Sequence, residues 1–151
     1  MGHVTMNSPL GALTIFEDSG SIAVIEWGRA ARPESSPLLI EAKRQLDAYF
    51  DGRIKDFELP VAPRGTPFQQ AVWALISAIP FGATRTYGDL ARRLRTSPRP
   101  VGGACGRNPI PIVIPCHRVI GSGSRRMGGY SGGDGVATKQ ALLRLEGQLL
   151  V

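Results

Sequence analysis

The chain has 151 residues, of which 42% are hydrophobic, and its formal net charge at pH 7 is +6. This length and composition predict a soluble globular protein with one ordinary domain or two small ones. They argue against a membrane protein, because no apolar run approaches the roughly 18 residues of a membrane span. The N-terminus also lacks the basic and then apolar residues of a secretion signal, so we expect a cytoplasmic protein with reduced cysteines.

Charge is divided unevenly along the chain. Residues 1–63 carry six Lys or Arg and nine Asp or Glu, whereas residues 64–151 carry twelve and three. Eleven of the twelve cations in the second part are arginine, the residue best suited to phosphate and base-edge contacts. This distribution favours a nucleic-acid partner for the second part, with an ordinary basic surface as the alternative.

The first part of the chain has the pattern of a β-meander followed by a helix. Short alternating segments separated by turn residues predict strands at residues 4–7, 12–17 and 22–27. A helix is expected over residues 37–50, with Ser36 as its N-cap and Pro37 in its first turn.

The junction between the two parts is rich in proline. Residues 57–59 predict one more strand, and residues 60–65 have the composition of a linker. The charge changes sign at the same place. We therefore expect an N-terminal domain over residues 1–61 and a second domain over residues 62–151.

The second part is predicted to be mostly helical. Thr66, Pro67 and Gln69 form the signature of a capped helix start. Further helices are expected at residues 87–95, 97–107 and 136–145. The two middle helices are joined tightly, as in a helix-turn-helix, although ordinary packing of two helices explains such a pair equally well.

Three glycines interrupt the helix predicted at residues 97–107. Gly102, Gly103 and Gly106 each cost about 1 kcal/mol relative to alanine inside a helix, so something must compensate for them. Small residues let a helix backbone approach another surface closely. That surface is either a second helix or a nucleic-acid groove, and the pattern leaves both open.

A cysteine with an adjacent histidine carries the chemical signal. Cys116 follows an apolar run that contains three prolines, and His117 comes directly after it. The prolines predict a stiff, extended connection, and a neighbouring imidazole favours the reactive thiolate. The alternative is an inert buried cysteine. Glu146 ends the last predicted helix; it either holds His117 and favours the thiolate or is a solvated surface group.

Two further features bear on ligands. The segment 121–133 is rich in glycine and contains Tyr130, which favours either a mobile loop that closes over a flat ligand or a plain surface linker. Two cysteines and two histidines without ligand spacing argue against a metal site. We expect no metal and no cofactor.

Several ordered segments together resemble a known family. The most specific is Asn108-Pro-Ile-Pro-Ile-Val-Ile-Pro-Cys-His-Arg-Val-Ile120, and it is supported by Gly65–Gln69 with Trp73, Thr86–Gly88, Pro98–Gly102, Gly129–Gly133 and Leu142–Gly147. In these segments the chain resembles the O6-alkylguanine-DNA alkyltransferases, also called methylated-DNA–protein-cysteine methyltransferases. The resemblance is dense over residues 66–147 and weak but compatible over the first sixty.

The resemblance implies both a fold and an activity. The fold would be an α/β N-terminal lobe, ribonuclease-H-like with a small antiparallel sheet and a helix, followed by a mostly helical winged-helix or helix-turn-helix-like domain. The activity would be DNA repair by direct reversal. The alkyl group of O6-alkylguanine in double-stranded DNA moves irreversibly, in a single turnover, to Cys116 after the damaged base has flipped out of the duplex. O4-alkylthymine is left open as a second substrate, and the protein would act as a monomer.

The resemblance also implies roles for individual residues in the transfer. Cys116 would accept the alkyl group, with His117 as its base through a water and Glu146 orienting His117. Asn108 would brace the turn that carries the thiol. Tyr87 would donate a proton to the departing guanine.

Four further residues would contact DNA or the flipped base. Arg99 would fill the gap left in the duplex, and the helix that holds Gly102 would rest in the minor groove. Tyr130 and Ser131 would line the pocket for the base.

Three other functions are weighed against this one. A reader of alkylated DNA without the reaction is opposed by the presence of Cys116. A cysteine hydrolase normally takes its histidine from a distant part of the chain, and here only His3 is distant. A helix-turn-helix regulator reads bases with side chains, which Gly102, Gly103 and Gly106 cannot supply.

Overall fold

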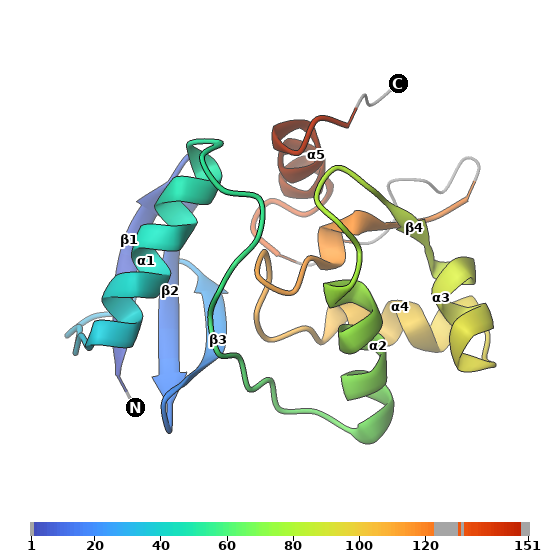
Figure 1. The fold of residues 1–151 in the computed structure, drawn as a ribbon, viewed down its shortest axis with the longest axis horizontal. Helices are drawn as coiled ribbons and strands as arrows, with labels where there is room; N and C mark the ends of the chain where they lie inside the picture. The colour runs from blue at the N-terminus through green and yellow to red at the C-terminus, as the bar shows by residue number, and fades with distance from the viewer. Residues whose placement is uncertain (1, 123–129, 131, 149–151) are drawn as a thin grey trace. The chain divides into compact units, whose positions relative to one another are not determined.

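The chain divides into two compact units, residues 1–64 and residues 65–151. The structure is a computed structural model that describes residues 2–122, 130 and 132–148 (Figure 1). Each unit is held together by its own internal contacts. In the described part of the chain, no helix combines the length and the apolar character that crossing a membrane requires.

The first unit is built on a three-stranded antiparallel sheet. Its strands are β1 (His3–Ser8), β2 (Gly11–Asp18) and β3 (Ser21–Trp27), in that order across the sheet. Met6 of β1 lies opposite Leu13, and Ile15 of β2 lies opposite Ile25 of β3. These four side chains are buried, because alternate residues of a strand face the same side of the sheet. The three strands predicted from the sequence are confirmed.

Helix α1 (Pro37–Phe50) contacts β1 and β2 and completes the core of this unit. The hydroxyl of Ser36 accepts a hydrogen bond of 3.2 Å from the backbone N–H of Leu39, as the sequence predicts for an N-cap. Leu39, Leu46 and Tyr49 are fully buried.

The strand predicted at residues 57–59 is wrong. The backbone of Glu58 is paired with a side chain of α1 instead of a strand. Its N–H donates to Oε1 of Gln45 at 2.8 Å, and its carbonyl accepts from Nε2 of Gln45 at 3.2 Å. The pairing with β3 comes later, where the N–H of Ile22 donates to the carbonyl of Pro60 at 2.8 Å and the N–H of Ala62 donates back to Ile22 at 3.0 Å.

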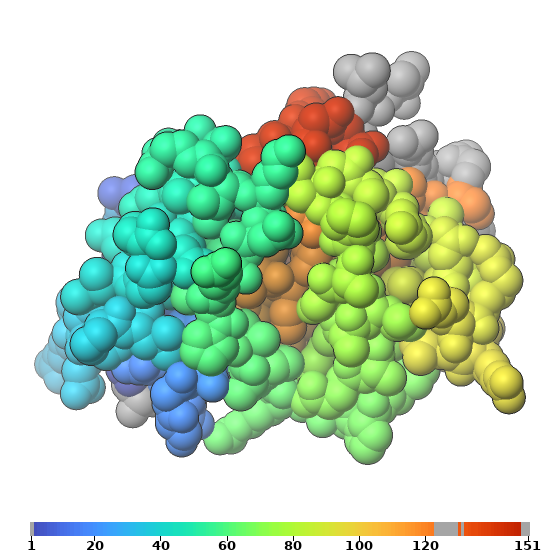
Figure 2. All heavy atoms as spheres, viewed as in Figure 1, coloured from blue at the N-terminus to red at the C-terminus, as the bar shows by residue number. Residues whose placement is uncertain are grey.

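The second unit is mostly helical. Its elements are α2 (Pro67–Ser77), β4 (Arg85–Thr86), α3 (Tyr87–Leu94), α4 (Pro98–Gly106), the 3-10 turn η1 (Cys116–Arg118), β5 (Val119–Ile120) and α5 (Val136–Leu145). The four helices predicted here are confirmed. Strands β4 and β5 pair in parallel. In Figure 2, the atoms of α2, in green, and of α3 with the start of α4, in yellow, lie at the surface of this unit.

Local capping explains where α2 and α3 begin. Thr66 with Gln69 and Thr86 with Asp89 form complete capping boxes, in which each side chain bonds the other residue's backbone N–H. Thr86 is also the last residue of β4. Tyr87 is therefore fixed at the first position of α3, between a strand and a helix.

A buried tryptophan ties α2 to α4. Trp73 is only 2% exposed, and its indole N–H donates a hydrogen bond of 2.9 Å to the carbonyl of Ala104. Because a buried indole N–H without a partner is costly, this bond fixes where α4 lies against α2.

Candidate active site

The proline-rich segment before Cys116 is a tight turn. The N–H of Ile114 donates to the carbonyl of Ile110 at 2.9 Å, and the N–H of Cys116 donates to Ile114 at 2.8 Å. Ile112 adopts a φ of +73°, which is strained for a β-branched residue. The extended connection expected from the prolines is therefore wrong: the prolines stiffen a chain that turns back on itself.

Asn108 spans this turn with its side chain. Its Nδ2 donates to the carbonyl of Ile114 at 2.8 Å, and its Oδ1 accepts from the N–H of Ile110 at 2.9 Å. One carboxamide thus satisfies both ends of the turn. The position of Cys116, two residues after Ile114 and at the start of η1, follows from that bracing.

Cys116 and His117 are both buried, and His117 contacts Glu146. Cys116 is 8% exposed and His117 is 0% exposed. A hydrogen bond of 2.8 Å joins Nε2 of His117 to Oε2 of Glu146, which caps the C-terminal end of α5 and is 3% exposed. Of the two readings of Glu146, the solvated surface group is excluded.

The other ring nitrogen of His117, Nδ1, is buried and has no hydrogen-bond partner among the described residues. A buried polar atom of this kind usually has a functional or solvent partner. The geometry therefore leaves Nδ1 as the atom of His117 that can exchange a proton.

Burial works against charge on both Cys116 and His117. It raises the pKa of the Cys116 thiol, although a hydrogen bond from Asn108 and the charge of Lys139 oppose that rise. Burial also lowers the pKa of His117, against the opposing effect of Glu146. The thiolate expected from the sequence is thus not the resting form of this structure, because desolvation penalises the charged state. The thiol needs a base when it reacts.

Lys139 is a buried cation that the sequence interpretation missed. It is 0% exposed, and its Nζ lies 5.7 Å from the centre of the Tyr87 ring. Burial lowers its pKa, while the nearby Cys116 and Cys105 thiols raise it. Lys139, Leu142, Leu143 and Glu146 are buried together on α5. Their i, i+3, i+4, i+7 spacing places a lysine within an apolar helical face, and that signal was available in the sequence.

Arg118 was missed as well. It is 5% exposed and donates two hydrogen bonds to Glu146, from Nε to Oε1 at 2.7 Å and from Nη2 to Oε2 at 2.9 Å. An arginine directly after the Cys-His pair, inside an apolar run, was the sequence signal for a buried partner.

Two tyrosines and a second cysteine lie near the thiol. Burial and the Cys105 and Cys116 thiols raise the pKa of Tyr87 to about 12. Burial and the nearby Cys116 raise the pKa of Tyr130, and its hydroxyl has no hydrogen-bond partner in the described part of the chain. Cys105, on α4, is a buried free thiol. Ser131, predicted to line the same pocket, lies outside the described residues, as does most of the glycine-rich segment 121–133.

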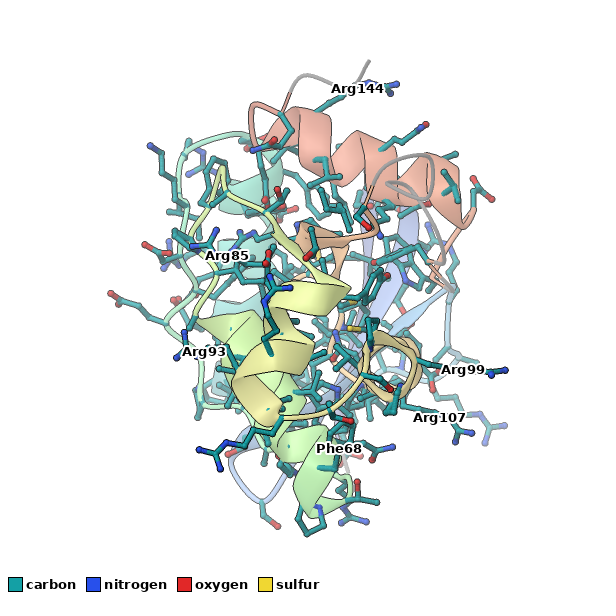
Figure 3. All side chains as sticks on the ribbon, turned by 90° about the vertical axis from the view of Figure 1, so that its right-hand side faces the viewer. Phe68, Arg85, Arg93, Arg99, Arg107 and Arg144 are labelled. Atoms are coloured by element: carbon teal, nitrogen blue, oxygen red, sulfur yellow. The ribbon has the colours of Figure 1, made fainter. Side chains whose placement is uncertain are left out.

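The remaining predicted residues lie at the surface, beside an open cavity of about 1100 Å³. Tyr87, Arg99 and Gly102 line it together, with residues of α3, the start of α4 and the chain after β5. Figure 3 shows Arg99 and Arg107 extending from α4 to the same side of the unit. Arg99 lines the cavity and, in the described part of the chain, forms no hydrogen bond or ion pair with Cys116, His117 or Glu146. Tyr87 lines the same cavity and also lies near Cys116.

The glycines of α4 face open space. A Cβ placed on Gly102, Gly103 or Gly106 would meet no heavy atom within 4 Å. Packing against a second helix of this unit is therefore not what requires them. The surviving explanation is close approach of something that is not part of the described chain.

The site can activate a thiol close to an open cavity whose lining includes basic residues. It combines a thiol, an imidazole with one free nitrogen, a carboxylate that holds the other nitrogen, and a protonated phenol. Such a set supports nucleophilic attack by sulfur with a proton relay. The helix beside it is suited to a large, flat or grooved anionic partner.

Two family models match the chain, one for each unit. The description "6-O-methylguanine DNA methyltransferase, ribonuclease-like domain" applies to residues 1–63. The description "6-O-methylguanine DNA methyltransferase, DNA binding domain" applies to residues 67–148. Together with the sheet and helices above, these matches confirm the fold class expected from the sequence.

Individual proteins match over nearly the whole chain. A methylated-DNA–protein-cysteine methyltransferase of Methanosarcina acetivorans is 38% identical, over 97% of this chain and 99% of its own length. The constitutive enzyme of the same description from Bacillus subtilis is 39% identical, over 95% and 94%. The crystal structure of Mycobacterium tuberculosis OGT in complex with DNA superposes with a TM-score of 0.86 at 39% identity, covering 97% of this chain and 92% of that one.

Proposed function

The chain belongs to the family of methylated-DNA–protein-cysteine methyltransferases, and on that premise we propose that it repairs O6-alkylguanine in DNA by taking the alkyl group onto Cys116. The observation that supports the assignment to this residue is the buried contact of 2.8 Å between Glu146 and His117, the residue directly after Cys116 in the sequence. A carboxylate that holds one imidazole nitrogen orients the ring so that the other can act as a base.

The transfer is a displacement at the alkyl carbon. His117 Nδ1 takes the thiol proton of Cys116 through a water, and the sulfur lone pair forms the new S–C bond. The O6–C bond breaks, and its electron pair goes to the guanine. Asn108 and Lys139 favour the transient thiolate, because both act to lower the pKa of Cys116.

Tyr87 supplies the proton that the departing guanine needs. With a pKa of about 12, its phenol keeps its proton at neutral pH until a strongly basic group appears beside it. The proton taken up by His117 then restores the phenol. The net result is that the thiol proton ends on guanine and the alkyl group ends on sulfur.

The DNA side of the site explains how the base reaches a buried thiol. O6 of guanine lies inside a stacked base pair, so the nucleotide must rotate out of the duplex, which costs a few kcal/mol. We assign Arg99, exposed in the first turn of α4, to the gap that this leaves. Gly102 lets the backbone of α4 approach the minor groove, and Tyr130 and Ser131 line the pocket of the flipped base.

The stability of the product limits the reaction to one turnover per chain. An alkylated Cys116 is a thioether, which has no carbonyl for water to attack and does not hydrolyse as an acyl-thiol does. Each chain is therefore consumed by one substrate. All of the groups assigned come from one chain, so we propose a monomer that works in the cytoplasm, where cysteines stay reduced.

The test is intact-mass spectrometry after mixing the protein with an excess of duplex DNA that contains O6-methylguanine. We expect a gain of one methyl group per chain, located on the peptide that contains Cys116. The Cys116→Ala variant, which keeps the same surface, should bind the DNA and gain no mass. Parallel reactions with O6-benzylguanine and O4-methylthymine define the range of substrates.

Two results would contradict the proposal. Sustained release of repaired DNA beyond one equivalent would mean that the thioether is not the end point. Binding of alkylated DNA by the wild-type protein without any gain of mass would make it a reader of damage.

A further inference from the structure

Arg118 is a buried cation two residues after the candidate nucleophile. It ends η1, directly after Cys116 and His117, and is 5% exposed. Burying a guanidinium costs several kcal/mol unless its donors are well paired. A buried Arg118 is therefore tolerated only if its N–H groups have partners.

Three sides of the Arg118 guanidinium are occupied. Nε and Nη2 donate to the two carboxylate oxygens of Glu146 at 2.7 and 2.9 Å. Nη1 donates to the carbonyl of Ile79 at 2.7 Å, and the guanidinium lies 5.8 Å from the centre of the Phe81 ring. A two-pronged contact of this kind fixes the plane of the carboxylate as well as its place.

The two hydrogen bonds from Arg118 restrict the hydrogen-bonding role of Glu146. A guanidinium can only donate, so both oxygens of Glu146 act as acceptors toward Arg118. Oε2 also lies 2.8 Å from Nε2 of His117. A carboxylate has no proton to give in that contact, so Nε2 of His117 must be the donor. The lone pair of the neutral ring is then on Nδ1.

We propose that Arg118 is a positioning residue: it holds Glu146 as an acceptor-only carboxylate and thereby keeps the proton of His117 on Nε2 and its lone pair on Nδ1. The inference deepens the proposed function, since Nδ1 matters because it takes the proton of Cys116. Arg118 itself bonds to Glu146 and acts through it.

The charges around His117 give this role a dependence on pH. Glu146 acts to raise the pKa of His117, whereas burial, Arg118 and Lys139 act to lower it. These groups come from η1 and α5; α2, which also packs against η1, carries no ionisable side chain in its sequence. The net direction is down, so the ring stays neutral and able to accept a proton near pH 7.

Removing the charge of Arg118 should shift this balance in a defined direction. Glu146 would act on His117 without its counter-charge, so the pKa of His117 would rise and more of the ring would be protonated near pH 7. A protonated ring cannot accept the thiol proton. In Arg118→Gln, the acid limb of the pH profile of alkyl transfer should move to higher pH: a loss of about tenfold or more near pH 6.5, recovering largely near pH 8.5.

Nuclear magnetic resonance reads the tautomer directly. The chain contains only His3 and His117, so the protein labelled with ¹⁵N-histidine gives two ring systems, and His3 serves as an internal reference. In the wild-type protein, long-range ¹H–¹⁵N spectra should show His117 neutral with its proton on Nε2. In Arg118→Gln, a fraction with the proton on Nδ1, or a titration at higher pH, is expected. Glu146→Gln, whose amide can donate to Nε2, shows what the other tautomer looks like.

Arg118→Lys separates charge from geometry. It keeps the positive charge and loses the two-pronged contact, so its titration should stay closer to the wild type than that of Arg118→Gln. If Arg118→Gln does not fold, Arg118→Lys carries the test, because losing one of the two contacts should still populate the Nδ1–H tautomer measurably. A folded variant whose tautomer and titration both match the wild type would overturn the proposal.

A failure of the role proposed for Arg118 can be distinguished from a failure of the proposed function. The spectra are recorded on the resting protein without DNA, so they report on Arg118 even if no alkyl group is ever transferred. Conversely, single-turnover methylation of Cys116 with an unchanged pH profile in Arg118→Gln would leave the proposed function intact and remove Arg118 from it.

Discussion

Lys139 is a charged residue in a place where charge is expensive. It is fully buried on α5, and burial lowers its pKa. The position of Lys139 near Cys116 explains why a buried charge is kept, since this charge acts to lower the pKa of the thiol. A group kept for reactivity in this way should matter more for activity than for stability.

Replacing Lys139 with methionine tests this expectation. In Lys139→Met we expect the pKa of Cys116 to rise and the rate of alkyl transfer near pH 7 to fall by about tenfold, the equivalent of about one pKa unit. Any loss of thermal stability should be smaller than the loss of transfer rate, because the variant no longer bears the cost of burying a charge. The measurements are the pH dependence of iodoacetamide labelling at Cys116, mapped by peptide mass, and the melting temperature.

The matched control is Lys43→Met. Lys43 is exposed on α1 in the first unit, so the same change of side chain there should leave both the labelling of Cys116 and the transfer rate as they are. Equal losses of stability and activity in Lys139→Met would instead assign Lys139 a purely structural part.

Individual site residues differ in how far the sequence could predict them. Cys116 and His117 could be predicted directly, because they are adjacent in the sequence. For Glu146 the residues left two alternatives open, a contact with His117 or a solvated surface group, because a separation of 29 residues hides the contact, and the family resemblance implied the first. Arg118 and Lys139 were missed because charged side chains are usually exposed. Burial of a charge depends on partners from other elements, which one-dimensional spacing does not contain.

Helix α4 combines helix-weakening glycines with open space around them. Adding a side chain at Gly102 should therefore help the helix, because nothing in the described protein opposes it. We predict that Gly102→Leu keeps or raises the melting temperature and weakens binding to duplex DNA by about tenfold or more, a loss in the range that removing one good contact produces. Calorimetry measures the melting temperature, and a fluorescence titration measures the affinity for duplex DNA.

Gly103→Leu is the control for this effect. Gly103 has the same open surroundings, but it is not among the residues that line the cavity with Tyr87 and Arg99. Its substitution should give a similar change in stability and a smaller loss of binding. Equal losses at the two positions would mean that the cavity side of α4 has no special part in contact with DNA.

Elements were predictable where their determinants are local. The helices begin where Ser36, Thr66 and Thr86 cap them, and each of these bonds spans only three residues. The failures have distant causes. The strand at 57–59 is displaced by Gln45, thirteen residues away, and the turn before Cys116 closes through the side chain of Asn108, which spacing alone does not reveal.

At the scale of the whole molecule, the charge of the chain is segregated by unit. The acidic excess lies in residues 1–63 and the basic excess in residues 64–151. If DNA binds the second unit, the position of a basic residue should matter more for the affinity for DNA than the net charge of the chain. Counterion release then predicts a loss of salt dependence only where a phosphate contact is lost.

Two substitutions with the same change in net charge test this. Arg107→Gln, at the exposed end of α4, should weaken binding to DNA of any sequence and reduce the slope of log K against log salt by about 0.9. Lys43→Gln, on α1, should change neither. Equal effects of both on affinity would indicate that binding follows overall charge and does not use the face of α4.

The contact between His117 and Glu146 has a consequence for the order in which the protein acquires its reactivity. His117 and Glu146 are 29 residues apart in the sequence, so their contact forms only when α5 packs against η1. A chain in which α5 has not yet packed has the thiol without the carboxylate, without Lys139 and without the partner of Arg118. If each chain reacts only once, as proposed, this dependence on folding keeps the thiol from being activated before the unit that must deliver it to DNA has folded.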